Sequence, residues 1–208
     1  HAAPYQPQQV SNEAKWVAHL DADALRKSSL VERAYRRALA IEPSLARRLD
    51  GLKAQLGVDL RTDLHGLTVY GKRIGKNEGV VLAHADMDQK GLLFRVQWAP
   101  GHRTVRHGDR EIHTWIEAKG GKDERGVAAA FHSASLLVIA PTVDEVQAAL
   151  EALDGRGAAL AKDSPLAAAA PEGTVALARA MEPAGADLPF KSPLLTQSEA
   201  FSLAAGEC

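Results

Sequence analysis

Four ionisable side chains that could bind a metal lie close together in the sequence: His102, His107, Asp109 and His113. Neutral imidazoles and a carboxylate are ligands that zinc and iron accept in proteins. The two strands of a predicted hairpin can bring two of the histidines together, but Asp109 falls at the tip of the turn and no HExxH motif is present. Two interpretations stay open: a metal site, or an exposed hairpin whose histidines respond to pH.

Two aspartates four residues apart, Asp59 and Asp63, form a second pattern with catalytic potential. Paired carboxylates can perform acid/base chemistry or bind a metal. These two follow Gly57, a typical end for a helix, and precede the alternating stretch LTVYG, which is typical of a strand. Aspartates in such positions commonly accept amide hydrogens in tight turns. We therefore predict a helix-to-strand corner in which both carboxylates are structural.

Three arginines of one predicted helix, Arg33, Arg36 and Arg37, are the candidate ligand-binding residues, because guanidinium groups can bind an anion. Acidic side chains are interspersed with basic ones over residues 21–60. A solvated face of mixed charge is therefore the competing interpretation.

No nucleophile in the sequence has the partners that catalysis requires. Ser133 and Ser135 lie beside His132, but neighbouring residues of a strand point to opposite faces, and the GxSxG motif is absent. Cys208 is the only cysteine, so it forms no disulfide within the chain, and we expect its thiol to lack a fixed base. We predict no catalytic residue and no cofactor.

The composition narrows the classes of partner. A formal net charge of -1 provides no overall positive field for nucleic acid, and with 5% aromatic residues there is no series of rings on which bases could stack. The longest apolar runs, such as Leu136 to Pro141, are far shorter than the roughly 18 to 20 residues of a membrane-spanning helix. We expect a protein or a small ligand as partner, no nucleic acid and no transmembrane segment.

Hydrophobic patterns predict the elements that position these residues. Helical spacing of apolar residues predicts helices over 29–41, 44–56 and 143–153, and capping boxes begin two of them at Ser29 and Thr142. Asp86 or Asp88 caps a further short helix. Strands are predicted at 15–21, 67–71, 79–86, 104–107, 110–118, 127–133, 136–141, 174–181 and 200–208. Because 136–141 is apolar throughout, we place it at the centre of the sheet.

The order of these elements divides the chain into three parts. Residues 1–14 form a polar opening that we expect to be flexible. Residues 15–155 are predicted to form one α+β domain with a mostly antiparallel sheet. Residues 156–208 form a Pro/Ala-rich extension with one or two strands, where a second similar subdomain could begin. Because an open edge strand invites pairing, we expect that the chain continues past Cys208 or that its end pairs with 174–181.

The order of these motifs resembles a group of uncharacterised exported bacterial proteins, a domain of unknown function. In that group a G-[IV]-D-x-x-x-D-[IL] corner precedes a strand, as GVDLRTDL does here, and a later strand pair leads into a helix ending near Asp-Gly. The resemblance covers roughly residues 15–155. It implies a ferredoxin-like sheet with helices packed on one face and a location in the cell envelope. It offers no catalytic residue to carry over.

These patterns together predict a non-catalytic exported domain that binds a partner or ligand through its sheet, an exposed hairpin or the basic helix pair. The alternative is a metal-dependent enzyme built on residues 102–113. A structural module of a larger envelope assembly is a third hypothesis. The Pro/Gln/Ala-rich opening agrees with export to the periplasm, and a cytoplasmic location is the alternative.

Overall fold

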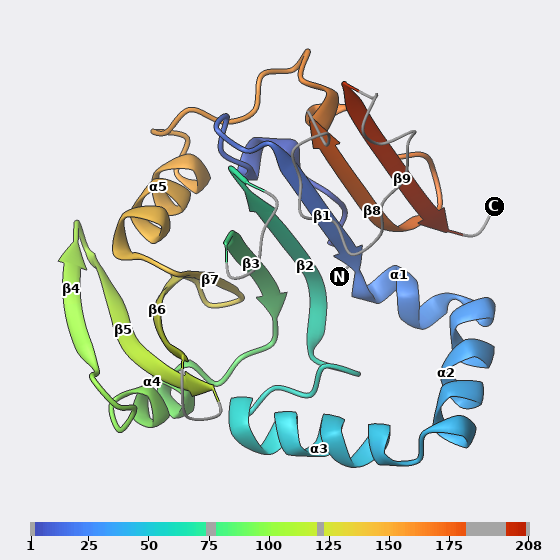
Figure 1. Ribbon diagram of the computed structural model, residues 1–208, viewed down its shortest axis with the longest axis horizontal. Helices are drawn as coiled ribbons and strands as arrows, with labels where there is room; N and C mark the ends of the chain where they lie inside the picture. Colours follow the sequence, from blue (N-terminus) through green and yellow to red (C-terminus); the bar gives the residue numbers. More distant parts are fainter. Residues whose placement is uncertain (1–2, 74–77, 120–122, 182–198, 207–208) are drawn as a thin grey trace.

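One antiparallel sheet forms the frame of the molecule (Figure 1). The computed structural model describes residues 3–73, 78–119, 123–181 and 199–206. Within them, nine strands lie in the order β4-β5-β6-β7-β3-β2-β1-β8-β9, and all neighbours are antiparallel. The strands are β1 (Trp16–Asp21), β2 (Leu64–Gly71), β3 (Val80–Ala85), β4 (Arg103–His107), β5 (Arg110–Lys119), β6 (Asp123–Ser133), β7 (Leu136–Ala140), β8 (Thr174–Met181) and β9 (Ala200–Gly206). The α+β class is confirmed, and the sheet is larger than the ferredoxin-like sheet that the resemblance implied.

Five α-helices and two short 3-10 helices connect the strands within the described residues. They are η1 (Pro7–Gln9), α1 (Ala22–Lys27), α2 (Ser29–Ile41), α3 (Ser44–Leu56), α4 (Gln89–Val96), α5 (Val143–Leu153) and η2 (Pro165–Ala167). None of the helices in this part of the chain combines the length and the apolar character that crossing a bilayer requires.

Side-chain caps fix where several helices begin. Thr142 Oγ1 accepts the amide of Glu145 and donates to the Glu145 carboxylate, so the predicted capping box of α5 is confirmed. The box predicted at Ser29 is wrong by one residue, because Ser28 Oγ accepts the amide of Val31 and caps α2. Asp88, one of the two predicted candidates, caps α4 by accepting the amide hydrogen of Gly91. Local sequence therefore determines these boundaries to within a residue.

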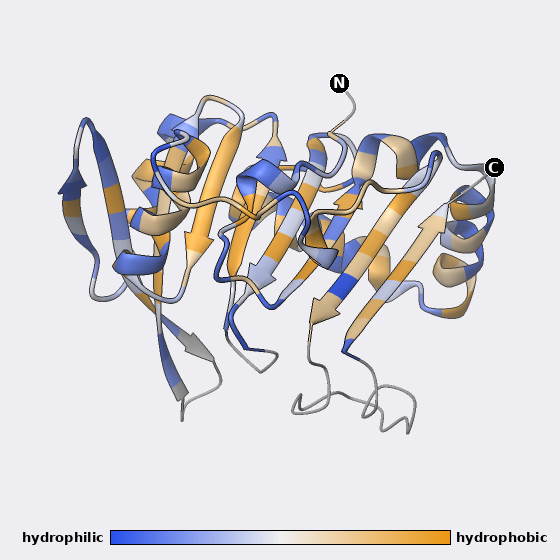
Figure 2. Cartoon of the chain, turned by 90° about the horizontal axis from the view of Figure 1, so that it is seen from above, coloured by the Kyte–Doolittle hydropathy of each residue, from blue (hydrophilic) through white to orange (hydrophobic). Residues whose placement is uncertain are grey.

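The packed core lies on the face of the sheet that α5 covers (Figure 2). Val146, Ala149 and Leu150 of α5 are buried against apolar side chains that alternate strands present to this face. The buried strand residues include Val17, Leu82, Ile112, Ala128, Ala130 and Val138. We call this side of the sheet the first face.

Residues before β1 and residues between α5 and β8 complete the core. Val10 and Ala14 are buried there, and the amide of Leu160 donates to the carbonyl of Val10 at 2.9 Å. Tyr5 Oη donates to the carbonyl of Leu166 at 2.9 Å, which joins the opening segment to η2. The expectation of a flexible segment over 1–14 missed this packing of residues 3–14.

The extension beyond residue 155 joins the same sheet. β8 pairs with β1, and β9 pairs with β8 at the edge. The expected pairing of the chain end with residues 174–181 is therefore present over residues 200–206, while Cys208 lies outside the described residues. The predicted central strand, β7, is adjacent to β3, the middle strand of the nine.

Three helices lie on the opposite side of the sheet from α5. Figure 1 shows α2, α3 and α4 along this second side. Neither α3 nor α4 contains a buried residue, and no described side chain within α2 is buried. Helices packed on one face of the sheet were expected; instead, helices lie on both sides and only α5 contributes a helical face to the main core.

Replacing Leu150 by alanine tests the position of the core. Leu150 is fully buried, and its truncation leaves a cavity, so we expect a loss of about 2–5 kcal/mol in the free energy of unfolding. Leu203→Ala on the exposed edge strand β9 is the matched control, with an expected loss of about 0.5 kcal/mol or less. Urea unfolding followed by circular dichroism measures both. Equal losses would contradict the assigned core.

Candidate functional site

The predicted metal cluster only partly assembles. His102 and His113 stack with their ring centroids 5.5 Å apart, and His102 Nε2 lies 3.2 Å from His113 Nδ1. Burial, and then the charge of His102, lowers the pKa of His113. His107 instead faces Glu151 of α5, with 3.7 Å between Nε2 and Oε1, and Asp109 is exposed at the hairpin turn. The hairpin thus brings two of the four predicted ligands together.

A complete metal site does not emerge from this geometry. Within the described ranges, no group of three or more His, Cys, Asp or Glu side chains is placed to hold a metal ion. Thr104 Oγ1, at 3.4 Å from His113 Nδ1, is the other polar group near the two rings. The arrangement fits two imidazoles that share one hydrogen bond, with His113 favoured in its neutral form.

The predicted anion-binding arginines lie on the exposed surface of α2. Arg33, Arg36 and Arg37 are all exposed, and Arg36 forms an ion pair with Glu32 one turn away. An exposed pair of this kind contributes little to stability. The structure thus displays the three side chains to solvent without gathering them into a pocket.

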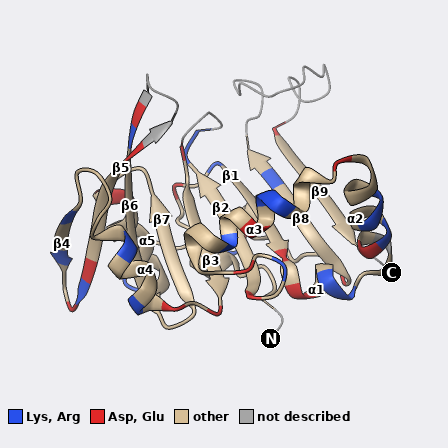
Figure 3. Ribbon diagram, turned by 90° about the horizontal axis from the view of Figure 1, so that it is seen from below, with Lys and Arg blue, Asp and Glu red and all other residues tan. Residues whose placement is uncertain are grey.

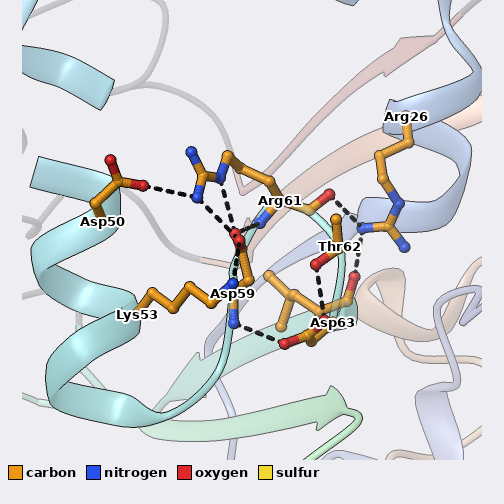
Figure 4. A network of polar contacts seen from close by, with 8 residues as sticks. Arg26, Asp50, Lys53, Asp59, Arg61, Thr62 and Asp63 are labelled. Carbon is orange, nitrogen blue, oxygen red and sulfur yellow. Dashed lines mark hydrogen bonds and ion pairs between the residues drawn. The ribbon is translucent and has the colours of Figure 1, made fainter. Parts of the chain in front are cut away.

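The residues from Asp59 to Asp63 form a closed polar corner (Figure 4). The Asp59 amide donates to Asp63 Oδ2 at 2.8 Å, and the Arg61 amide donates to Asp59 Oδ1 at 3.0 Å. Amide hydrogen bonds of Thr62 and Asp63 to the Asp59 carbonyl tighten the turn. Gly57, with φ of 69°, ends α3 before it. The predicted corner is confirmed, and both carboxylates are occupied by turn amides.

Charged side chains tie this corner to α3. Arg61 donates to both oxygens of Asp59, at 2.8 and 2.9 Å, and also reaches Asp50 at 2.8 Å. Lys53 Nζ lies 3.2 Å from Asp59 Oδ2. The hydrogen bonds from the side chain and amide of Arg61 hold the pKa of Asp59 far below its usual range. A carboxylate held ionised in this way is a poor general base, which favours the structural role.

Two further polar clusters were missed because their members are distant in sequence. His65 of β2 lies between Asp23 of α1 and Asp86, at 3.2 Å and 3.3 Å from their carboxylates. His132 and Arg110 both contact Asp154 at the end of α5, at 3.0 and 2.7 Å. Hydrogen bonding from Arg110 lowers the pKa of Asp154 to about 2. Both clusters fasten helix ends to strands, and sequence spacing contains no signal for either.

The candidate nucleophiles remain dispersed. The imidazole of His132 is directed to Asp154, and the Ser133 hydroxyl accepts the amide of Ser135 at 3.4 Å. The pairing of β6 with β7 is irregular between Phe131 and Ser133, so simple strand alternation does not extend to His132. The other candidate, Cys208, lies outside the described residues.

The second face of the sheet is the largest chemical feature of the molecule. Burial alternates along β1, where Val17 and His19 are buried while Trp16, Ala18 and Leu20 are only half-buried. The registers place apolar residues beside them on four neighbouring strands, half-buried except for buried Ala180. They are Leu67, Val69, Val81, Ala83, Leu137, Ile139, Ala176, Ala178 and Ala180. We call these twelve residues the second face.

This surface departs from the usual pattern of an antiparallel sheet. A sheet covered on one face normally alternates apolar and polar residues, so that its open face meets water with polar groups. The second face carries no charged or polar side chain, and Figure 3, which views the molecule from the α3 side, shows the strands largely free of charged positions. The residues of the second face are mostly half-buried, so this side of the sheet is only partly covered within the described part of the chain.

A groove lined mainly by apolar residues lies between α1, α2 and the corner, with a volume of about 320 Å³. Its apolar lining residues are Ala22, Leu25, Val31, Tyr35 and Leu60. Arg26, Glu32 and Arg61 also line it, and the two arginines are paired with Asp23 and Asp59. Its volume lies within the range of small-molecule sites, about 300–1,000 Å³.

Removing the Asp59 carboxylate tests the structural assignment of the corner. Asp59→Asn should lower the urea midpoint at pH 7 more than Asp50→Asn, because Asp59 holds the turn whereas Asp50 is an exposed partner of Arg61. The pKa of Asp59 is depressed in the fold, so its stabilisation is present above the usual carboxyl range, begins to be lost as pH falls below about 4, and is fully lost only below the pKa of the folded state. The difference between Asp59→Asn and the unmodified chain should shrink at pH 3; a constant difference would contradict this assignment.

The effect of His102 on the pKa of His113 can be tested separately. His102→Ala removes both the neighbouring charge and part of the burial that lower the pKa of His113, so that pKa should rise toward its ordinary value near 6.5. His107→Ala, a histidine on the same hairpin that faces α5, should leave it unchanged. NMR titration of the imidazole resonances measures both variants. An unchanged His113 titration in His102→Ala would show that the two rings do not interact.

Three comparisons with known proteins found no match for this chain. No protein-family model, no curated protein and no solved structure matches it.

Proposed function

We propose that this chain is a non-catalytic binding domain that holds a small apolar or amphiphilic molecule against the second face of its sheet. The observation that carries this proposal is the chemistry of that face: twelve apolar positions on five adjacent strands, without a charged or polar side chain. Burying such a surface against a ligand yields about 25 cal/mol per Å² of apolar area. A ligand with an extended apolar body gains most from it.

The helices on this side favour a small ligand over a second folded domain. α2, α3 and α4 lie over the second side of the sheet (Figure 1), so a rigid partner sheet would meet them first. They contribute no described buried residue, which means that they do not replace the missing covering layer. The groove beside α1 and α2 shows that this side also offers a concave apolar site of ligand size.

The remaining parts of the proposal rest on sequence. An envelope location is supported by the polar opening and by the resemblance to exported proteins, and release of the native protein by osmotic shock would test it. The rival hypothesis of a metal-dependent enzyme has less support, because His107 and Asp109 lie away from the His102–His113 pair. The three arginines of α2 are exposed and do not line a catalytic cleft.

Titration with the neutral apolar dye N-phenyl-1-naphthylamine tests this function. We expect saturable fluorescence enhancement, and a loss of affinity of at least about tenfold in Val69→Lys and Val81→Lys, because a buried ammonium without a partner opposes apolar contact. Val69 and Val81 are directly opposite each other on β2 and β3.

Val105→Lys provides the matched control, because it makes the same substitution on the exposed edge strand β4. Its affinity for the dye should stay within about twofold of the unmodified chain. Circular dichroism and urea unfolding establish that each variant is folded. Equal dye binding by all four proteins would refute the assignment of the second face.

A further inference from the structure

We infer that α3, together with α4, docks on an anionic lipid surface. This interaction involves helix surfaces and is independent of ligand binding to the second face. It is carried by three observations: an apolar stripe on α3, exposed aromatic side chains on and beside α4, and a concentration of positive charge on the helices of this side.

The first observation is the stripe of leucines along α3. Leu45, Leu49, Leu52 and Leu56 recur at helical spacing, so they share one side of the helix. None of them is buried, and Leu52 and Leu56 are 38% and 41% exposed. Since an amphipathic helix of a folded domain normally buries this stripe, α3 presents an apolar surface that the described residues cover only in part.

Cations flank the stripe on both sides. Helical spacing places Arg48 along one border of the leucines and Lys53, which pairs with Asp59, along the other, whereas Arg47 lies on the opposite side of the helix. Long basic side chains in these positions can bury their aliphatic stems while their charges reach phosphate groups. Helices with this distribution lie in the plane of a membrane interface.

Two aromatic side chains extend the surface. Phe94 in α4 is 63% exposed, Trp98 just after it is 79% exposed, and their rings make an edge contact at 6.4 Å. Arg95 Nη1 donates to the carbonyl of Gln55 at 3.1 Å, which holds α4 beside the end of α3. Tryptophan is the residue most suited to the boundary between headgroups and acyl chains.

The charge of the helices selects the kind of lipid. α2 contains three arginines and one glutamate, α3 contains two arginines, a lysine and an aspartate, and α4 contains a lysine and an arginine. Their combined net charge is +6, whereas the whole chain has -1. This separation of charge attracts an anionic surface to the helical side without making the protein basic overall.

Vesicle sedimentation tests the inference with the full chain. At 0.1 M NaCl we expect binding to vesicles of phosphatidylcholine with phosphatidylglycerol and little binding to pure phosphatidylcholine. Arg48→Glu should weaken binding by at least about tenfold. Trp98→Ser should also weaken it and should reduce the blue shift of tryptophan emission on binding.

A control with the same change in net charge separates a local site from general attraction. Arg106→Glu reverses one exposed arginine on edge strand β4 and should leave vesicle binding within about twofold. Equal loss in both charge-reversal variants, equal binding to neutral vesicles, or no binding to anionic vesicles would overturn the inference. The last result would point to an acidic protein as the partner of α3.

The two proposed interactions can fail separately. Val69→Lys should retain binding to anionic vesicles, because it alters the sheet and leaves α3 intact. The Arg48→Glu variant should retain binding of N-phenyl-1-naphthylamine. Loss of both activities in either variant would contradict two independent surfaces.

Discussion

Apolar side chains on both faces of one sheet are the constraint on which this structure depends. Each face needs a cover, because apolar surface in contact with water is unfavourable by about 25 cal/mol per Å². The first face obtains its cover from α5, from residues 3–14 and from the segment around Leu160 and Leu166. The second face has helices beside it, but these lack buried side chains among the described residues. This inequality between the two covers is the basis of the proposed binding at the second face.

The α2–α3 pair is held to the rest of the molecule by polar contacts at its ends. Arg26 donates to the carbonyl of Leu64 at 2.7 Å, Arg61 and Lys53 join the corner to α3, and Arg95 reaches Gln55. Exposed ion pairs contribute about 0–1 kcal/mol each, much less than the burial of a leucine stripe. A segment fastened in this way has a lower free energy of local opening than the core.

Local patterns predicted the elements, whereas long-range pairing decided their arrangement. The capping box at Thr142, the αL glycine at Gly57 and the corner at Asp59 depend on neighbours within four residues, so the sequence displays them directly. The pairing of β8 with β1 joins residues over 150 positions apart, and neither strand specifies its partner. Val10 belongs to the core because Leu160 and α5 meet it there. The register of the hairpin is compatible with contact between His102 and His113. Alternation along β4 and the position of the turn direct His107 and Asp109 away from this pair.

An exposed apolar surface can lead to self-association, and the charges of this chain oppose it. Two molecules that approached through the leucine stripe of α3 would bring Arg48 of one copy near Arg48 of the other, and this like-charge contact opposes self-association. The edge strand β4 carries Arg103 and Arg106, which oppose pairing of strands at that edge. An anionic surface reverses the sign of the first effect, since Arg48 then attracts it. Arg48 thus disfavours a second copy and favours the proposed lipid surface through one property, the positive charge that borders a partly covered apolar stripe.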